Sequence, residues 1–537
     1  MTGRYLDSDF QRFEKSICEI HKISKTDLIT IHIQQPEESF FATYQLTDDD
    51  KSIRIADFDD HRVFAVASLF KPLIATGLAL IIEKLSISPE EKHQRFHCLK
   101  EAWGKSFTLI FNSLEPKFRI KRLEGDPHVK QLLCHFRGVY NMNHILLAPD
   151  GSPLLSEEDF LAVVSQFTKD TRTKHDRGAW VSYSNSNFIL LALLIEAVSK
   201  MSIQEFLKEY VFVPLEMNHT CTTIDELHGL PDGLLAKPHA VSGSGLRTTI
   251  SLDRHPYLAN TVEFALAGGY TTAGDYGRFQ RALIRGFYEP GSSLLDHKVS
   301  KFLVEILSEV VEEQPNGYAA CGFLTMLHEP WAGSHSLNSL VSPYSKCKDW
   351  VLGKSVGEEE IRAHYAAGSA TGWASTAYLV LEQSFSIVVL TNSSGPLDST
   401  DRITQLCLAE LLELWPARYD KGKLALDCLS PKSTPRRERT QAHHVELSRL
   451  LYKENAAKFK QLEEEDSPQS TTNTGCPNVC GAFECRNTRQ SLQIWLVDSM
   501  LHVRMIGSKG KESGLMRDGL DCVDRFARVS SESTGFD

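Results

Sequence analysis

The sequence has no apolar run long enough to cross a membrane as a straight helix. Its longest apolar runs, at 73–85 and 188–198, have the length of buried helices. Residues 1–7 show no apolar segment like that of a secretory signal, so we expect a cytoplasmic protein with no membrane span. An excess of basic residues is also missing: 58 Lys and Arg stand against 69 Asp and Glu, giving a net charge of −11. This balance argues against a nucleic-acid partner, because polyanion binders present basic surface.

Paired cysteine spacing is missing as well. The twelve cysteines are scattered, as is typical of thiols in a reducing compartment. Cys476, Cys480 and Cys485 lie close together, but their spacing matches no zinc template and no fourth ligand stands near them. We therefore predict free thiols, no metal site and no cofactor.

The first motif with chemical content is Ser68-Leu69-Phe70-Lys71, directly ahead of the apolar run 73–85. At a spacing of three, both polar side chains lie on one helical face, so the amine can take the serine proton and return it. The helix N-terminus adds unpaired N–H groups beside a forming oxyanion. Taken alone the motif is weak, since a serine N-cap followed by a solvated lysine has the same pattern.

Two later segments strengthen this interpretation. Tyr183-x-Asn185 precedes the apolar run 189–198. A tyrosine beside a lysine can act as base toward the serine and as acid toward the leaving group; the alternative is a packed tyrosine with an asparagine cap. Gly368 and Ser369 precede the apolar strand 387–392. A glycine there lets substrate approach the backbone, so that the Ser369 N–H can serve as a second oxyanion donor.

In this order, these segments resemble the serine β-lactamase superfamily, on its class C, esterase and fungal acyltransferase-like side. Three further segments resemble family motifs: 132–138, 214–217 and 267–279. The resemblance implies an α+β (α/β sandwich) fold of the β-lactamase/transpeptidase type, with an antiparallel sheet, flanking helices and an all-α lobe at about 87–215. It also implies Ser68 as nucleophile, Lys71 and Tyr183 as proton carriers, and Asn185 as a group that orients substrate or lysine.

One departure from the family pattern concerns substrate. Class C enzymes have Lys-Thr-Gly-Ser in the third motif and esterase relatives replace the lysine by histidine, whereas this chain has Ala366-Ala367-Gly368-Ser369. The family uses that cation to bind a substrate carboxylate, so its loss argues against β-lactams and D-Ala-D-Ala peptides. His364 would face the same side of the strand and could substitute through a shifted register; a core or surface histidine is the alternative.

Four further residues are expected to pack in the core or to line a pocket. His135 is expected to be a buried packing and hydrogen-bonding residue. Phe70, Trp180 and Trp373 could line a hydrophobic acyl pocket or simply pack in the core.

Composition and periodicity divide the chain into three parts. Residues 1–415 form the predicted catalytic domain, with a first helix at 8–22, a hairpin of 28–34 with 40–46, and a terminal helix at 400–414. A Pro-rich and charged linker follows at 416–440. Residues 441–537 are predicted to hold a helix at 442–464 and a small β domain, which resembles the C-terminal β-domain of fungal β-lactamase-like proteins.

The predicted function is that of a serine acyl-enzyme hydrolase or acyltransferase. Its expected partner is a small-molecule ester, thioester or amide, with a carrier-bound acyl donor as a further candidate and secondary-metabolite biosynthesis as a setting. A β-lactamase-fold binding or scaffold protein without turnover is the alternative, and a true β-lactamase is less favoured. Neither the acceptor nor the oligomeric state follows from the sequence.

Overall fold

The structure is a computed structural model of the 537-residue chain. It describes residues 6–55, 61–115, 120, 123, 126–135, 146, 155–167, 183–250, 258, 261–289, 291, 295–305, 318–319, 322–326, 336, 338, 350–351, 361–370, 372–414, 417–420, 423–425, 436–465, 481–485, 490–497, 500–506, 512–513 and 527–529. Two compact units emerge: the first comprises 1–100, 204–253 and 267–460, and the second comprises 101–203, 254–266 and 461–537. Each unit is described by itself.

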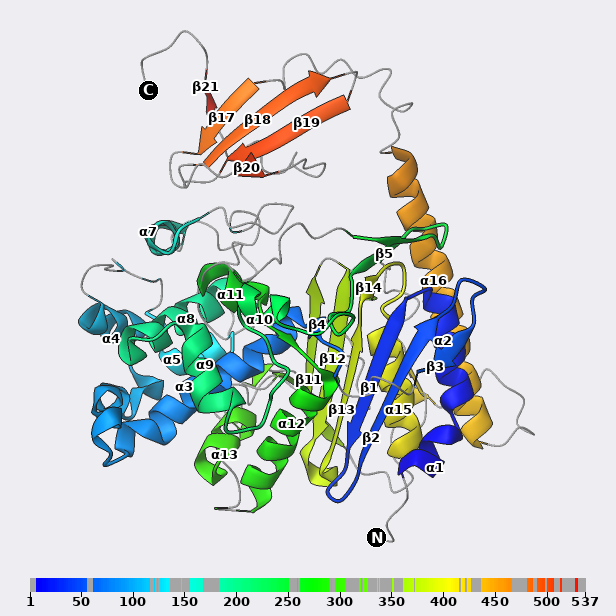
Figure 1. Cartoon of the computed structure of the whole chain (residues 1–537), viewed down its shortest axis with the longest axis horizontal. Helices are drawn as coiled ribbons and strands as arrows, with labels where there is room; N and C mark the ends of the chain where they lie inside the picture. The colour runs from blue at the N-terminus through cyan, green and yellow to red at the C-terminus, as the bar shows by residue number, and fades with distance from the viewer. Residues whose placement is uncertain are drawn as a thin grey trace. The chain divides into compact units, whose positions relative to one another are not determined.

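An eight-stranded antiparallel sheet forms the centre of the first unit (Figure 1). Its strands, in spatial order, are β3 Ser52–Arg54, β2 Ser39–Leu46, β1 Leu28–Gln34, β13 Phe385–Thr391, β12 Trp373–Val380, β11 Arg362–Ala370, β9 Gly322–Met326 and β8 Tyr318–Ala319. The predicted hairpin of 28–34 with 40–46 is confirmed, and in it Ile31 lies opposite Ala42. On its other edge β1 pairs with β13, so segments from opposite ends of the catalytic region are neighbours.

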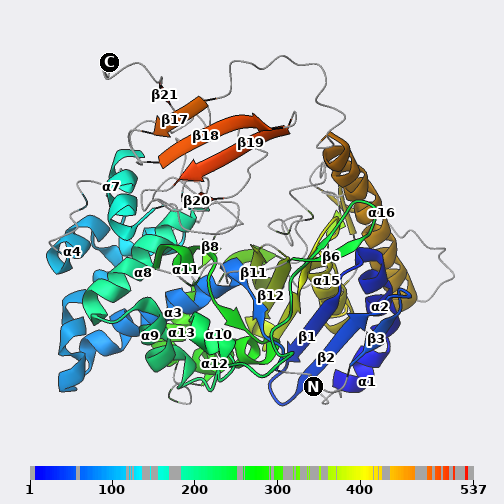
Figure 2. The ribbon, with the colours of Figure 1, turned by 45° about the horizontal axis from the view of Figure 1, so that its top comes forward.

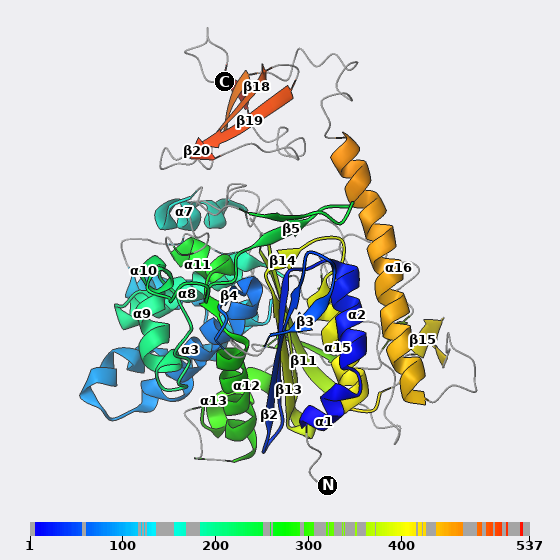
Figure 3. The same ribbon diagram turned by 45° about the vertical axis from the view of Figure 1, so that its right-hand side comes forward.

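One face of the sheet is covered by helices from both ends of this unit (Figure 3). They are α1 Leu6–Gln11, α2 Glu14–Ser24 and α15 Ser399–Leu411. The predicted single helix at 8–22 is therefore two helices, separated at Arg12 and Phe13. Phe13 remains fully buried at this break and packs with Phe10 of α1, so the short interruption keeps both aromatic rings in the core.

The other face carries α12 Ala273–Tyr288, which packs against α13 His297–Glu305, and α13 in turn contacts α3 Lys71–Glu83. Helix α12 packs on β1 and β13, and its Gln280 side chain donates to the carbonyl of Tyr378 at 3.3 Å. Helix α3 is buried along nearly its whole length, as its apolar sequence predicts. The sheet is thus a middle layer between two sets of helices.

The second unit contains helices that belong to the predicted all-α lobe. They are η4 Ala102–Gly104, α4 Phe107–Leu114, α5 Val129–Leu133, α7 Glu157–Phe167 and α8 Asn185–Ser199. The lobe predicted at 87–215 is longer than the helical part of this unit, because residues 87–100 and 204–215 group with the first unit. The reason is packing on α3, where Phe206 and Leu207 crowd the position at which Gly77 has no side chain.

The region after the catalytic part differs from its prediction. The predicted linker 416–440 contains β15 Ala417–Asp420 and β16 Lys423–Ala425, which form a small sheet with β10 Trp350–Val351. Helix α16 Arg436–Glu465 begins inside the predicted linker (Figure 2). Most of this helix groups with the first unit, because Leu447 and Leu451 are buried against Leu397.

A five-stranded antiparallel sheet ends the chain. Its order is β20 Glu512–Ser513, β19 Met500–Ile506, β18 Gln490–Val497, β17 Gly481–Cys485 and β21 Ala527–Val529. The pairing of β18 with β19 agrees with the hairpin predicted from the alternating sequence. Cys476 and Cys480 of the cysteine cluster lie outside the described residues.

In the described part of the chain, no single helix combines the length and apolar character of a membrane span. One bent pair, Asn185–Ser199 with Ile203–Phe212 at 79°, passes on length and composition.

Candidate active site

Ser68 and Lys71 come together at the start of the buried helix α3. Ser68 lies in the 3₁₀ turn η1 Ala67–Phe70, and Lys71 is the first residue of α3. The Lys71 ammonium Nζ donates to Ser68 Oγ at 3.1 Å. Pro72 favours this helix start, because its fixed φ suits the first turn and no N–H partner is needed there. The spacing of three thus produces the predicted contact.

The Lys71 side chain is almost completely removed from water, with an exposed fraction of 1%. Burial disfavours the charged form and lowers the pKa of Lys71 from 10.5 to about 7. Near neutral pH a large share of this amine is therefore unprotonated and able to accept a proton. Ser68 is half-buried. The pair therefore combines a partly accessible hydroxyl with a base of suitable pKa.

The turn ahead of Ser68 has an unusual backbone. Ala67 has φ of +48°, in the left-handed region that residues other than glycine rarely adopt. The Val66 N–H donates to the Gly269 carbonyl at 3.3 Å, next to the pairing of β4 Phe64–Ala65 with β7 Tyr270–Thr271. Strain of this kind persists only where neighbouring contacts hold it, and it is common at functional sites.

Strand β11 runs directly against this turn. At Gly368 an added Cβ would overlap the Val66 carbonyl oxygen and would lie 2.9 Å from the Leu69 nitrogen. The glycine is therefore needed for the close approach of two backbones, whereas the sequence predicted a close approach of substrate. Ser369, the next residue, is exposed.

Part of β11 keeps a free edge within the described residues. Its pairing with β9 covers Arg362 to Tyr365, whereas its pairing with β12 continues to Ala370. The segment from Ala366 onward therefore has one edge without a described strand partner. A strand edge of this kind can present backbone N–H groups to a ligand.

Ser375 was not predicted from the sequence as a residue of the site. It lies on β12 opposite Gly368, and its Oγ donates to the Val66 carbonyl at 2.9 Å. The only sequence signal for this contact is the strand pairing of a serine with the motif glycine, and that pairing requires knowledge of the register.

His364 does not supply the missing cation of the third motif. Its Nε2 lies 3.0 Å from the Val304 carbonyl of α13, to which the neutral ring donates. Burial lowers the pKa of His364 to about 4, so the ring is uncharged near neutral pH. Of the two readings left open by the sequence, the structure supports the core histidine. Ala366 is buried, with 7% of its surface exposed.

Trp373 and Phe70 are packed inside the unit. The Trp373 indole is fully buried, donates from Nε1 to the Ala236 carbonyl at 3.3 Å, and meets Tyr270 edge-on. Phe70 lies edge-on to Phe212. Both side chains have packing roles here, and a part in an acyl pocket would require their faces to become accessible. Trp180 lies outside the described residues.

Tyr183 and Asn185 belong to the second unit, at the start of α8. The Ser184 N–H donates to His135 Nδ1 at 3.1 Å, and the His135 ring packs on Tyr183 with centroids 4.5 Å apart. Asn187 donates to the Leu132 carbonyl at 3.3 Å. His135 is thus a buried packing and hydrogen-bonding residue, as predicted. It positions the loop that carries Tyr183, whose part in a site with Ser68 stays a prediction.

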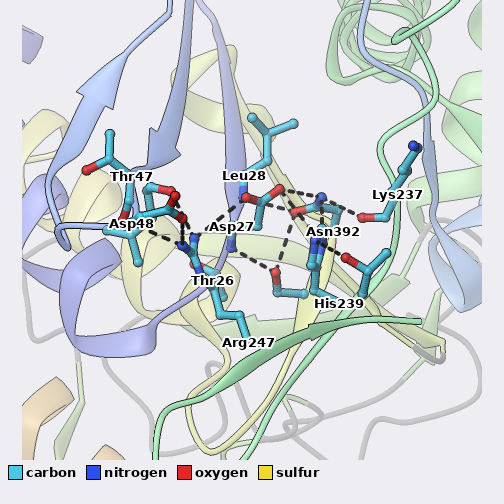
Figure 4. Close-up of polar contacts among 12 residues, drawn as sticks. Thr26, Asp27, Leu28, Thr47, Asp48, Lys237, His239, Arg247 and Asn392 are labelled. Atoms are coloured by element: carbon cyan, nitrogen blue, oxygen red, sulfur yellow. Dashed lines mark hydrogen bonds and ion pairs between the residues drawn. The ribbon is translucent and has the colours of Figure 1, made fainter. Parts of the chain in front are cut away.

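A cluster of polar contacts surrounds Asn392 and Asp27 (Figure 4). The Asn392 amide donates to Asp27 Oδ2 at 2.9 Å and to the Lys237 carbonyl at 2.6 Å, while its oxygen accepts from the Leu28 N–H at 2.9 Å. Arg247 approaches the same Asp27 carboxylate at 3.6 Å. These contacts tie the end of β13 and the start of β1 to the segment that contains Lys237.

Metal binding finds no support in the described part of the molecule. Within it, no group of three or more His, Cys, Asp or Glu side chains is placed to hold a metal ion. Five of its cysteines are free thiols: Cys18, Cys98, Cys134, Cys221 and Cys407.

Comparisons with known proteins identify the family of this chain. The Beta-lactamase family model matches residues 37–410. The chain is 27% identical over 163 residues to "Penicillin-binding protein 4*" of Bacillus subtilis (strain 168). The aligned region covers 29% of this chain and 30% of that protein. The match thus spans less than a third of the curated relative's length.

A solved structure shares the fold. The octameric penicillin-binding protein homologue from Pyrococcus abyssi superposes with a TM-score of 0.51 at 15% identity, covering 93% of this chain and 89% of that chain. The family model matches most of the chain, at residues 37–410. The antiparallel sheet between helical layers agrees with that match. The chain belongs to the beta-lactamase family, a family of β-lactamase-fold serine hydrolases.

Proposed function

We propose that this protein is a serine acyl-enzyme hydrolase or acyltransferase with Ser68 as its nucleophile. The observation that carries the proposal is the buried Lys71 amine, 3.1 Å from Ser68 Oγ and with its pKa lowered to about 7. A serine hydroxyl is a weak nucleophile at neutral pH, and an adjacent base activates it. Burial of a lysine next to a hydroxyl has a cost in stability that a purely structural role would not require.

The reaction has two steps. Lys71 takes the Ser68 proton as Oγ attacks the acyl carbonyl, and the Ser68 and Ser369 N–H groups stabilise the oxyanion. Collapse of the tetrahedral intermediate breaks the bond to the leaving group, which receives a proton from Lys71 or Tyr183. Water, an alcohol or an amine then attacks the acyl-enzyme by the reverse proton path. In this proposal Asn185 orients the substrate or the lysine.

The proposed substrate is an ester, thioester or amide of a small metabolite that does not depend on a carboxylate for binding. Ala366 stands where the family has a cation, and His364 is neutral and bonded to the Val304 carbonyl. Without a cation at that position, a substrate carboxylate would lose a charge-assisted hydrogen bond there. A carrier-bound acyl donor, a role in secondary metabolism and a cytoplasmic location are parts of the same proposal.

A second candidate is a binding or scaffold protein that keeps the fold without turnover. The observation in its favour is again Ala366, which removes a family binding group. The variant Ala366→His separates the two functions. If it leaves ester turnover largely unchanged, the enzyme proposal stands; if it creates turnover that the natural protein lacks, the scaffold proposal is correct.

The test of the main proposal is covalent labelling. The purified protein is incubated with a fluorophosphonate, and the adduct is located by mass spectrometry; p-nitrophenyl acetate hydrolysis is measured in parallel. We expect an adduct on Ser68 and loss of both signals in Ser68→Ala. An unlabelled Ser68, with equal ester hydrolysis by both proteins, would contradict the proposed nucleophile. Adding candidate alcohols or amines to the ester assay distinguishes transfer from hydrolysis by the products formed.

A further inference from the structure

The hydroxyl of Ser375 lies between the two backbone segments that carry the proposed oxyanion donors. Ser375 is directly opposite Gly368 in the β11–β12 register, and only 1% of its surface is exposed. Its Oγ is 2.9 Å from the Val66 carbonyl oxygen and 3.3 Å from the Gly368 carbonyl oxygen. One side chain therefore connects the turn before Ser68 to the strand before Ser369.

The Val66 carbonyl directly precedes the strained residue of the turn. It also accepts the Leu69 N–H at 3.0 Å, so both of its lone pairs are used. The next residue, Ala67, has the left-handed φ of +48°. A strained turn needs surrounding contacts to hold it, and the Ser375 hydrogen bond fixes the peptide at which the strain begins.

Gly368 leaves the space that this hydroxyl occupies. An added Cβ at Gly368 would be 2.6 Å from Ser375 Oγ and would also overlap the Val66 carbonyl. The hydroxyl, the glycine and the carbonyl therefore fill one shared space. A residue other than glycine at 368 would displace either the turn or the serine.

The Gly368 contact also affects an oxyanion donor. The Gly368 carbonyl and the Ser369 N–H belong to one planar trans peptide, so they point in opposite directions. Holding the carbonyl toward Ser375 directs the Ser369 N–H away from Ser375. Because the Ser375 hydroxyl has one proton, its contact with the Gly368 carbonyl at 3.3 Å is the weaker branch of a bifurcated hydrogen bond shared with the Val66 carbonyl at 2.9 Å.

We propose that Ser375 is a positioning residue for the acyl transfer at Ser68. Its hydroxyl sets the separation of the nucleophile turn and strand β11, and with it the alignment of the Ser68 and Ser369 N–H groups on the oxyanion. Ser375 itself touches no reacting atom. This role rests on the proposed function, because it has meaning only if Ser68 forms an acyl-enzyme.

The test compares Ser375→Ala with the wild type and with Thr376→Val. Thr376 is the adjacent residue of β12, is fully buried, and hydrogen-bonds Thr400 Oγ1 at 2.9 Å. Its side chain projects to the other face of the sheet. The control variant therefore removes a buried hydroxyl from the same strand without touching the turn.

For Ser375→Ala we expect kcat on p-nitrophenyl acetate to fall by about 10- to 100-fold, as a small misplacement of reacting groups does. The KM should stay unchanged, and the pH midpoint of the rate should stay near 7, because Lys71 is untouched. Phosphonylation of Ser68 by a fluorophosphonate should slow by a similar factor. Thr376→Val should keep wild-type kcat, and thermal unfolding shows that each variant is folded.

The outcomes separate the two proposals. If folded Ser375→Ala keeps wild-type kcat and phosphonylation rate, or if Thr376→Val loses as much as Ser375→Ala, the positioning role is wrong. If the wild type itself forms no Ser68 adduct, the proposed function is wrong and the positioning role falls with it.

Discussion

At the scale of single residues, the proposed chemistry depends on one buried amine. Lys71 places an ionisable group at the start of a largely apolar helix, and only 1% of its surface is exposed. The sequence spacing predicted its contact with Ser68, since residues three apart share a helical face. It did not predict the lowered pKa, because burial depends on the segments that pack over the helix.

A pH profile tests that amine. Below pH 7 the Lys71 amine is mainly protonated and cannot act as base, whereas above pH 7 it is mainly neutral. We expect log kcat/KM for p-nitrophenyl acetate to rise with pH and to level off with a midpoint near 7. The control is Ser68→Ala, which should show only background hydrolysis at each pH. A midpoint near the usual lysine value would contradict the lowered pKa of Lys71.

Gly368→Ala tests the close approach of β11 to the nucleophile turn. The new methyl group would overlap the Val66 carbonyl, so the strand or the turn has to shift. We expect a loss of about 100-fold in kcat, the size that a 1 Å misplacement produces, and a lower melting temperature. Gly104→Ala is the matched control, because its Cβ would have no atom within 4 Å. Equal activity of both variants would contradict the inferred contact.

At the scale of elements, periodicity predicted the strands well and the boundaries of the C-terminal helix less well. The hairpin of β1 and β2 was predictable because alternating apolar residues report a half-buried strand. Helix α16 begins at Arg436, inside a segment that its prolines and charges marked as linker. Its buried side chains on the first unit favour helix there, and local composition does not contain that information.

A pair of neighbouring leucines in α16 tests this docking. Leu451 has 4% of its surface exposed and packs with Leu447 and Leu397, whereas 41% of Leu450 is exposed. We expect Leu451→Ala to reduce the free energy of unfolding by about 2–5 kcal/mol, the usual range for a buried leucine. Leu450→Ala should have little effect. Chemical denaturation measures both, and similar losses would show that the helix does not dock through Leu451.

At the scale of the whole molecule, the candidate catalytic residues are divided between two units. Ser68, Lys71 and Gly368 lie in the first unit, and Tyr183 and Asn185 lie in the second. Within the second unit, His135 holds the loop of Tyr183 through the Ser184 N–H. The order of motifs along the chain predicts that the two groups act together.

A double-mutant cycle tests that prediction. If Tyr183 and Lys71 share the proton transfers of one reaction, the losses of Tyr183→Phe and Lys71→Met should not add. We expect the double variant to be about as inactive as Lys71→Met alone on p-nitrophenyl acetate. Asn112→Ala, in α4 of the same unit as Tyr183, is the control and should combine additively with Lys71→Met. Full additivity for Tyr183 would contradict a shared reaction.

The sequence by itself determined the family, the order of the main elements, and the pairing of Ser68 with Lys71 on one helical turn. These properties depend on local periodicity and on residue types at short spacing. Only the tertiary structure decided that burial lowers the pKa of Lys71 to about 7, that His364 bonds Val304, and that Ser375 bonds Val66 from 309 positions away. Each of these depends on burial and strand register, which arise when distant segments pack and are not encoded at any one position.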